Sequence, residues 1–191
     1  MQATTAGAVQ EIEVKYHVSD EAALLRALDE RGVVLSEPVR QDDQAYAPAG
    51  WRYGVSKIGV PFARLRTQDG MHLFTVKQPI DNEMACLEHE TTVADREQMH
   101  AALTTMGYVP TVRIVKSRRS GRWDDAALCL DTVDGLGTFV ELEAMVGADM
   151  SGLDVQYRLD RLVHSLGVPV QRTTDTYDSL IRDAGELARG A

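Results

Sequence analysis

The chain has 191 residues, a length that suits one domain of ordinary size. Apolar residues make up 44% of it, enough for a core, so a wholly disordered chain is excluded. Twenty basic residues against twenty-nine acidic ones give a formal net charge of −9, which argues against a general nucleic-acid binder. Any local cluster of Lys and Arg is therefore informative.

The sequence also bears on the cellular setting. No apolar run approaches the roughly 20 residues of a membrane-spanning helix. Residues 1–9 lack the basic start and the apolar stretch of a secretory signal. Cys86 and Cys129 make no disulfide framework, and their simplest interpretation is as small buried residues. We expect a cytoplasmic protein that forms one domain over residues 1–191, with its core in residues 10–183, and that binds neither membrane nor nucleic acid.

Hydrophobic periodicity and cap signals predict the elements. In chain order these are a strand at 11–18, a helix at 22–31, strands at 39–46, 63–67, 72–78 and 84–93, a helix at 95–106, strands at 112–119, 127–132 and 137–144, and helices at 153–166 and 176–187. Residues 48–61 form a long loop or hairpin, and Asp69-Gly70 indicates a tight hairpin turn. Most gaps between strands are too short for parallel crossovers, so we predict an α+β fold with mostly antiparallel pairing.

Charged residues recur at every second position in several predicted strands, and residues at this spacing share one face of a sheet. Glu11, Glu13 and Lys15 share such a face, and the opposite face of that strand is apolar or aromatic. Further members of the set are Glu88/Glu90, Glu141/Glu143, Arg64/Arg66, Lys116/Arg118 and Lys77. For a single strand the simplest interpretation is the solvated face of an ordinary sheet. The set differs, because like charges crowd within strands while acidic and basic pairs occupy separate strands.

A polyphosphate carrying a divalent metal would relieve both kinds of crowding. Arg offers forked donors and Lys a point charge to phosphate oxygens, and carboxylates hold hard cations such as Mg²⁺ or Mn²⁺. If the sheet curls until its charged faces look inward, about eight strands leave a narrow interior that suits one small ligand. The alternation follows from the residues, whereas closure into a barrel is a hypothesis.

Residues 11–15, Glu-Ile-Glu-Val-Lys, resemble the Glu-x-Glu-x-Lys signature of the CYTH, or triphosphate tunnel metalloenzyme, superfamily. The rest of the chain resembles the family in the same order, through Arg64-Leu65-Arg66, Lys77, Glu88-His89-Glu90, Lys116-Ser117-Arg118 and residues 130–133, 136–143 and 176–180. The resemblance implies a closed eight-stranded antiparallel β-barrel with flanking helices, a divalent metal and a small triphosphate substrate.

The resemblance also implies roles for individual residues. The metal-ligand candidates are Glu11, Glu13, Glu141 and Glu143, with Glu88 and Glu90 as further contributors. The phosphate-binding candidates are Lys15, Arg64, Arg66, Lys77, Lys116 and Arg118, and the catalytic candidates are Lys15 and Glu13. Cys86 stands where the family commonly has an Arg, so Arg113 is a candidate to supply that contact. Arg119 could exchange roles with Arg118, although alternation from Lys116 favours Arg118.

The family includes class IV adenylyl cyclases, thiamine triphosphatases, inorganic tripolyphosphatases and RNA triphosphatases. Residues 13–18 and 40–46 resemble the class IV cyclases, so we expect conversion of ATP to 3′,5′-cyclic AMP and pyrophosphate, and a homodimer. One alternative is a triphosphatase that hydrolyses a nucleoside, thiamine or inorganic triphosphate. Another is a non-catalytic module that binds a phosphometabolite or polyphosphate.

Three other positions have two interpretations each. Trp51 and Tyr53, in the loop at 48–61, could stack on a base, although packing on the barrel is simpler. Tyr177 could close one end of the tunnel, although ordinary packing is again simpler. Asp131 could support the site or act as a base, and a role in stabilising a turn is equally consistent with the sequence.

Overall fold

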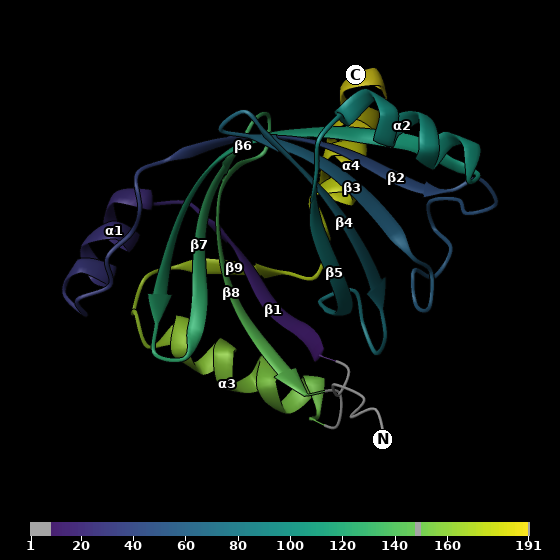
Figure 1. Ribbon diagram of the computed structural model, residues 1–191. Helices are drawn as coiled ribbons and strands as arrows, with labels where there is room; N and C mark the ends of the chain where they lie inside the picture. The colour runs from purple at the N-terminus through teal and green to yellow at the C-terminus, as the bar shows by residue number, and fades with distance from the viewer. Residues whose placement is uncertain (1–8, 148–149, 191) are drawn as a thin grey trace.

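The computed structural model describes residues 9–147 and 150–190. The expectation that residues 1–9 carry no secretory signal therefore concerns residues that, apart from Val9, lie outside the described part of the chain. Its elements in chain order are β1 (Val9–Val18), α1 (Glu21–Asp29), β2 (Val39–Pro48), β3 (Phe62–Gln68), β4 (Met71–Pro79), β5 (Ala85–Val93), α2 (Arg96–Thr105), β6 (Tyr108–Trp123), β7 (Ala126–Val133), β8 (Gly137–Gly147), α3 (Gly152–His164), β9 (Val170–Thr173) and α4 (Tyr177–Gly190) (Figure 1). Every predicted element is present. The prediction missed β9, and β6 extends beyond its predicted bounds at both ends.

The strands form a closed antiparallel ring. Their order is β5-β4-β3-β2-β6-β7-β8-β1, and β1 returns to β5 through three residue pairs between residues 10–12 and 85–87. β9 pairs with β1 along residues 15–18, beyond the point where β5 ends. The ring of eight strands confirms the predicted α+β fold and its closure, although the ring is not evenly barrel-shaped (Figure 1).

The main apolar core lies outside the ring. The outward faces of β1, β7 and β8 pack against α1 and α3, and α2 covers β2 and β3 on another side (Figure 1). Large buried members of the first core include Ile12, Val14, Tyr16, Leu24, Leu28, Leu142 and Leu159. Burying each such side chain is worth about 1.5–3 kcal/mol, and a slip of one residue would turn charged residues toward the helices. The outer core therefore dictates that the charged faces point into the ring.

Local signals explain where elements turn and begin. Asp69 and Gly70 have φ values of +49° and +74°, and they connect β3 to β4 as a two-residue hairpin, as their sequence predicted. The Asp95 carboxylate accepts hydrogen bonds from the backbone N–H groups of Glu97 and Gln98 and caps α2. No helix within the described residues is both long and apolar enough to cross a bilayer.

Candidate active site in the ring interior

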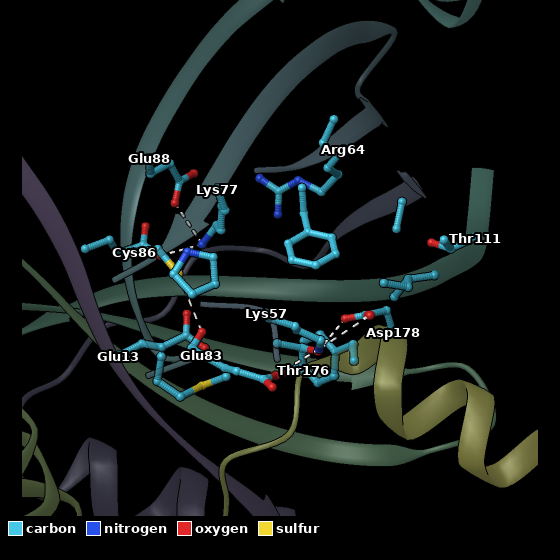
Figure 2. Close-up of a pocket in the computed structure, with 18 of the residues that line it drawn as sticks. Glu13, Lys57, Arg64, Lys77, Glu83, Cys86, Glu88, Thr111, Thr176 and Asp178 are labelled. Carbon is cyan, nitrogen blue, oxygen red and sulfur yellow. Dashed lines mark hydrogen bonds and ion pairs between the residues drawn. The ribbon is translucent and has the colours of Figure 1, made fainter. Parts of the chain in front are cut away.

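The ring encloses a cavity of about 370 Å³, a size suited to a small ligand. Apart from Arg113, every site residue predicted from the sequence lines it: Glu11, Glu13, Lys15, Arg64, Arg66, Lys77, Glu88, Glu90, Lys116, Arg118, Glu141 and Glu143. Figure 2 shows Glu13, Arg64, Lys77 and Glu88 around this space. Strands that are distant in sequence thus bring both signs of charge into one enclosed volume.

Three carboxylates meet where β1 and β8 run side by side. Glu13 lies directly opposite Glu143 in the strand register, and one ligand oxygen from each of Glu11, Glu13 and Glu143 lies within 4.8 Å of the others. Burial and the nearby carboxylates of Glu11 and Glu141 raise the pKa of Glu143 to about 8, and burial also raises the pKa of Glu11. A hard divalent cation such as Mg²⁺ or Mn²⁺ fits these oxygen donors and would relieve their repulsion.

Lys77 joins this acidic group to β5. Its ammonium contacts the Glu11 carboxylate and lies 2.7 Å from that of Glu88 (Figure 2). Burial by itself would lower the pKa of Lys77, but Glu11 and Glu88 raise it well above its ordinary value. Lys77 thus stays charged at the β1–β5 closure, where it bridges carboxylates from two strands.

The wall formed by β6 and β7, next to β8 in the ring, concentrates positive charge. The Asp131 carboxylate on β7 is fully buried, and it accepts hydrogen bonds from Lys116 at 2.7 Å and from Arg118 at 2.6 Å through both of its oxygens. Arg118 also donates to Glu141 at 2.5 Å. Burial and the charge of Arg118 lower the pKa of Lys116 to about 8. Asp131 lies within a strand, so it orients these cations instead of stabilising a turn.

Three further cations are held by the cavity wall. The Lys15 ammonium lies 3.3 Å from carboxylate oxygens of both Glu13 and Glu141, and these carboxylates raise the pKa of Lys15 even though its burial opposes that shift. Arg66 makes a buried two-bond contact with Asp43, each bond 2.7 Å long. Arg64 donates to Thr75 at 3.0 Å and to Glu90 at 3.2 Å.

The structure contradicts the prediction for Arg113. This side chain is exposed on the outer face of β6, where it donates to Asp42 at 2.8 Å. It stands three positions before Lys116, an odd spacing that puts the two side chains on opposite faces of one strand. Arg118 faces the cavity and Arg119 bonds outward to the carbonyl of Ser36, as alternation from Lys116 predicted.

The two cysteines behave as small buried residues, although one of them contributes to the cavity wall. Both are buried, and burial raises the pKa of each thiol to about 12. Cys86 lines the cavity, and the Cys129 sulfur lies within 4.8 Å of oxygens of Glu141 and Glu143. Because each remains a neutral thiol, neither adds charge to the site.

The aromatic residues of the long loop pack on the barrel and also line the cavity. The Trp51 ring packs edge-on against Tyr53 and Phe62, with centroid distances of 4.8 and 5.0 Å. The loop therefore packs on the barrel, as the simpler interpretation held. Yet all three rings also line the cavity, so one end of it is aromatic.

A second group of cavity residues lies at this aromatic end. No site role was predicted for them from the sequence, although Thr176 and Asp178 belong to the family-like segment 176–180. Lys57, Glu83, Thr176 and Asp178 line the cavity, and Lys57 is only 6% exposed (Figure 2). Lys57 stands alone in an irregular loop, so no periodic pattern could have marked it. Tyr177 also lines the cavity, and its hydroxyl donates to Asp131 at 3.0 Å.

Comparisons with known proteins agree with this geometry. The model of the CYTH domain family matches residues 9–177. A Methanocaldococcus jannaschii protein named "Putative adenylate cyclase MJ0240" is 26% identical over 138 residues, which cover 71% of this chain and 77% of that protein. The solved structure of PH1819 protein from Pyrococcus horikoshii matches with a TM-score of 0.75 at 22% identity, over 91% of this chain and 98% of that one.

A third match has a different description. HpAC1 from Hippeastrum, named as a candidate adenylyl cyclase, is described as revealing a dominant triphosphatase activity. It matches with a TM-score of 0.62 at 17% identity, over 92% of this chain and 95% of that one. At such identities the solved structures show a shared fold and nothing narrower.

Proposed function

This chain belongs to the CYTH domain family, as its motifs predicted, and on that premise we propose that it is a metal-dependent nucleoside triphosphate enzyme of the class IV adenylyl cyclase type. It would convert ATP to 3′,5′-cyclic AMP and pyrophosphate. One observation carries the proposal: the basic wall and the three-carboxylate cluster face the same cavity of about 370 Å³. A triphosphate with a bound divalent cation complements both.

The basic residues would hold the phosphate oxygens. Arg66 and Arg118 are each fixed by two hydrogen bonds to a buried carboxylate, so each guanidinium keeps its orientation before a ligand binds. Lys15 would remain protonated beside the reacting phosphate, because its carboxylate neighbours raise its pKa. Such preorganised positive charge is what a phosphoryl-transfer transition state requires.

Glu11, Glu13 and Glu143 would hold the divalent cation, and Glu141 would contribute mainly by holding Lys15 and Arg118. A bound Mg²⁺ or Mn²⁺ supplies Lewis-acid stabilisation and makes an attacking oxygen easier to deprotonate. Glu13 lies 3.3 Å from Lys15. Glu13 would thus hold the cation directly beside the phosphate that Lys15 binds. In the cyclase reaction the ribose 3′-oxygen bonds to the α-phosphorus, pyrophosphate leaves, and the hydroxyl proton passes to a base.

The aromatic end of the cavity favours an organic triphosphate. Trp51, Tyr53 and Phe62 line the same cavity as the charged residues, so a planar base could lie against them while its phosphates reach the cations. The main alternative is a triphosphatase, in which water attacks the terminal phosphorus. The activity described for the Hippeastrum protein favours this alternative.

Product analysis tests the proposal. The purified protein is incubated with ATP and Mg²⁺ or Mn²⁺, and the nucleotides and phosphates are resolved by chromatography. Equal amounts of cyclic AMP and pyrophosphate are expected, and chelation of the metal should abolish both. ADP with free phosphate and no cyclic product would reject the cyclase in favour of the triphosphatase. Binding of ATP without turnover would support the non-catalytic module. The proposed homodimer is checked separately by light scattering.

A further inference from the structure

Lys57 joins three segments at the aromatic end of the cavity. It lies in the loop between β2 and β3, and its ammonium lies 2.8 Å from the Glu83 carboxylate, in the segment before β5. At the start of α4, it donates to the hydroxyls of Thr176 at 2.7 Å and Ser179 at 2.9 Å, and it lies 3.6 Å from Asp178. Figure 2 shows Lys57 between Glu83 and the Thr176–Asp178 pair.

These contacts enclose Tyr177, because Lys57 holds the residues on both sides of it in the chain. The Tyr177 side chain is directed at the phosphate-binding residues. The Lys15 ammonium lies 4.4 Å and the Lys116 ammonium 4.8 Å from the centroid of its ring. Both distances are within the range of cation–π attraction. The Tyr177 hydroxyl donates to Asp131, which in turn holds Lys116.

Stability of α4 alone does not account for a lysine at this place. A cation beside the first turn of a helix opposes the helix dipole, and a buried ammonium is unfavourable unless it is paired. Glu83 and Asp178 provide that pairing, so two carboxylates offset the charge of Lys57. A neutral capping residue would stabilise the start of α4 without this requirement. The geometry therefore indicates a role beyond the helix itself.

We propose that Lys57 is a positioning residue of the triphosphate site. By holding Thr176, Asp178 and Ser179 it sets the Tyr177 ring, and through that ring it sets the ammonium groups of Lys15 and Lys116. This inference rests on the proposed function, in which those two lysines bind phosphate. It assigns a part in phosphate binding to a loop that carries none of the family's motif residues.

Two measurements on Lys57→Met test the proposal. The first is the NMR signal of the Tyr177 ring in ligand-free protein with ¹³C-labelled tyrosine, assigned with Tyr177→Leu. The second is the Kd for diimidotriphosphate, a hydrolysis-resistant tripolyphosphate analogue, with Mg²⁺. We expect the ring signal to shift and the Kd to rise about tenfold, as loss of well-placed cations implies. An unchanged ring signal, or an unchanged Kd, overturns the proposal.

A double-mutant cycle separates positioning from a merely structural effect. If Lys57 acts through Tyr177, Lys57→Met should change the Kd by less than about twofold in a Tyr177→Leu background. Effects that multiply fully overturn the proposal. Val55→Ala, at a 58% exposed position of the same loop, is the matched control and should leave both measurements unchanged.

A second variant covers a folding failure of Lys57→Met, and the ring signal covers a failure of the wild type to bind the analogue. Should Lys57→Met fail to fold, Ser179→Ala removes one contact of the same ammonium and should raise the Kd about threefold, whereas no rise overturns the proposal. If the wild type does not bind the analogue, the proposed function fails. The ring signal in Lys57→Met then decides by itself whether Lys57 sets Tyr177.

Discussion

The two walls of the cavity handle crowded charge in opposite ways. On β6 and β7, Lys116 and Arg118 share the buried Asp131 carboxylate, so their charges are paired before any ligand binds. On the neighbouring strands β8 and β1, Glu143 and Glu11 belong to a group whose ligand oxygens lie within 4.8 Å of one another. Asp131 preorganises the basic wall, whereas Lys15 and Lys77 pair the acidic group only in part, so its oxygens remain suited to a divalent cation.

β8 contributes Glu141 to the basic wall, where it pairs with Arg118, and Glu143 to the acidic group. Burial would raise the pKa of Glu141, but Lys15 and Arg118 outweigh it and lower that pKa. Two positions along the same face, burial and the Glu11 carboxylate raise the pKa of Glu143 to about 8. The strand sets the direction of both side chains, and neighbours on other strands set their charge.

The largest effect should follow from breaking the basic wall. Asp131→Asn removes the carboxylate charge that Lys116 and Arg118 share, so the buried Lys116 ammonium loses its close ion-pair partner and Arg118 keeps Glu141. We expect the free energy of unfolding, measured by urea denaturation, to fall by about 3–5 kcal/mol. Asp134→Asn, at a side chain that is 61% exposed, is the matched control and should cost less than about 1 kcal/mol. Equal losses would show that Asp131 does not hold this wall together.

Metal affinity should respond at the acidic group. Glu143→Gln removes one carboxylate of the cluster, so Mn²⁺ binding measured by calorimetry should weaken at least as much as the roughly 10–100-fold that loss of an outer-shell partner costs. Glu90→Gln provides the comparison, because Glu90 pairs with Arg64 and lies outside the cluster. We expect it to change the Kd by less than about threefold. The reverse order would assign the cation to β5.

Two arginines on β6 test the inward face of the basic wall. Arg118→Ala should raise the KM for ATP by about tenfold or more, because a charge-assisted phosphate contact is lost. Arg113→Ala, on the exposed face of the same strand, should leave KM and kcat at wild-type values. A larger effect at Arg113 would place the substrate outside the ring.

The last expected effect concerns the pH dependence of stability. Because the pKa of Glu143 is raised from 4.5 to about 8, the folded, metal-free protein binds a proton there that the unfolded chain has lost. The stability from this proton is complete below pH 4.5 and disappears as the pH rises to about 8. Between these values the wild type should lose up to about 4 kcal/mol more unfolding free energy than Glu143→Gln, because each pKa unit is worth about 1.4 kcal/mol. Equal losses in metal-free denaturation series would refute the shift.

Much of the fold could be predicted because its strands alternate. Ile12, Val14 and Tyr16 on one side, and Glu11, Glu13 and Lys15 on the other, define both faces of β1 whatever its partners are. The missed strand β9 has four residues, too few for a period, and it forms because β1 offers an unpaired edge there. Arg113 was assigned from a missing family residue, and strand alternation, which the structure follows, places it outside.

The candidate site, like the fold, could be predicted from the sequence only in part. The sequence by itself determined which residues carry charge, which of them share a strand face and which family they resemble, because these properties depend on neighbours within a few positions. Only the tertiary structure decided that Lys57 meets Thr176, that the Tyr177 ring lies near two lysines, and that the pKa values of Glu141 and Glu143 shift in opposite directions. Those properties depend on burial and on charges brought together by ring closure, and no local pattern in the chain encodes them.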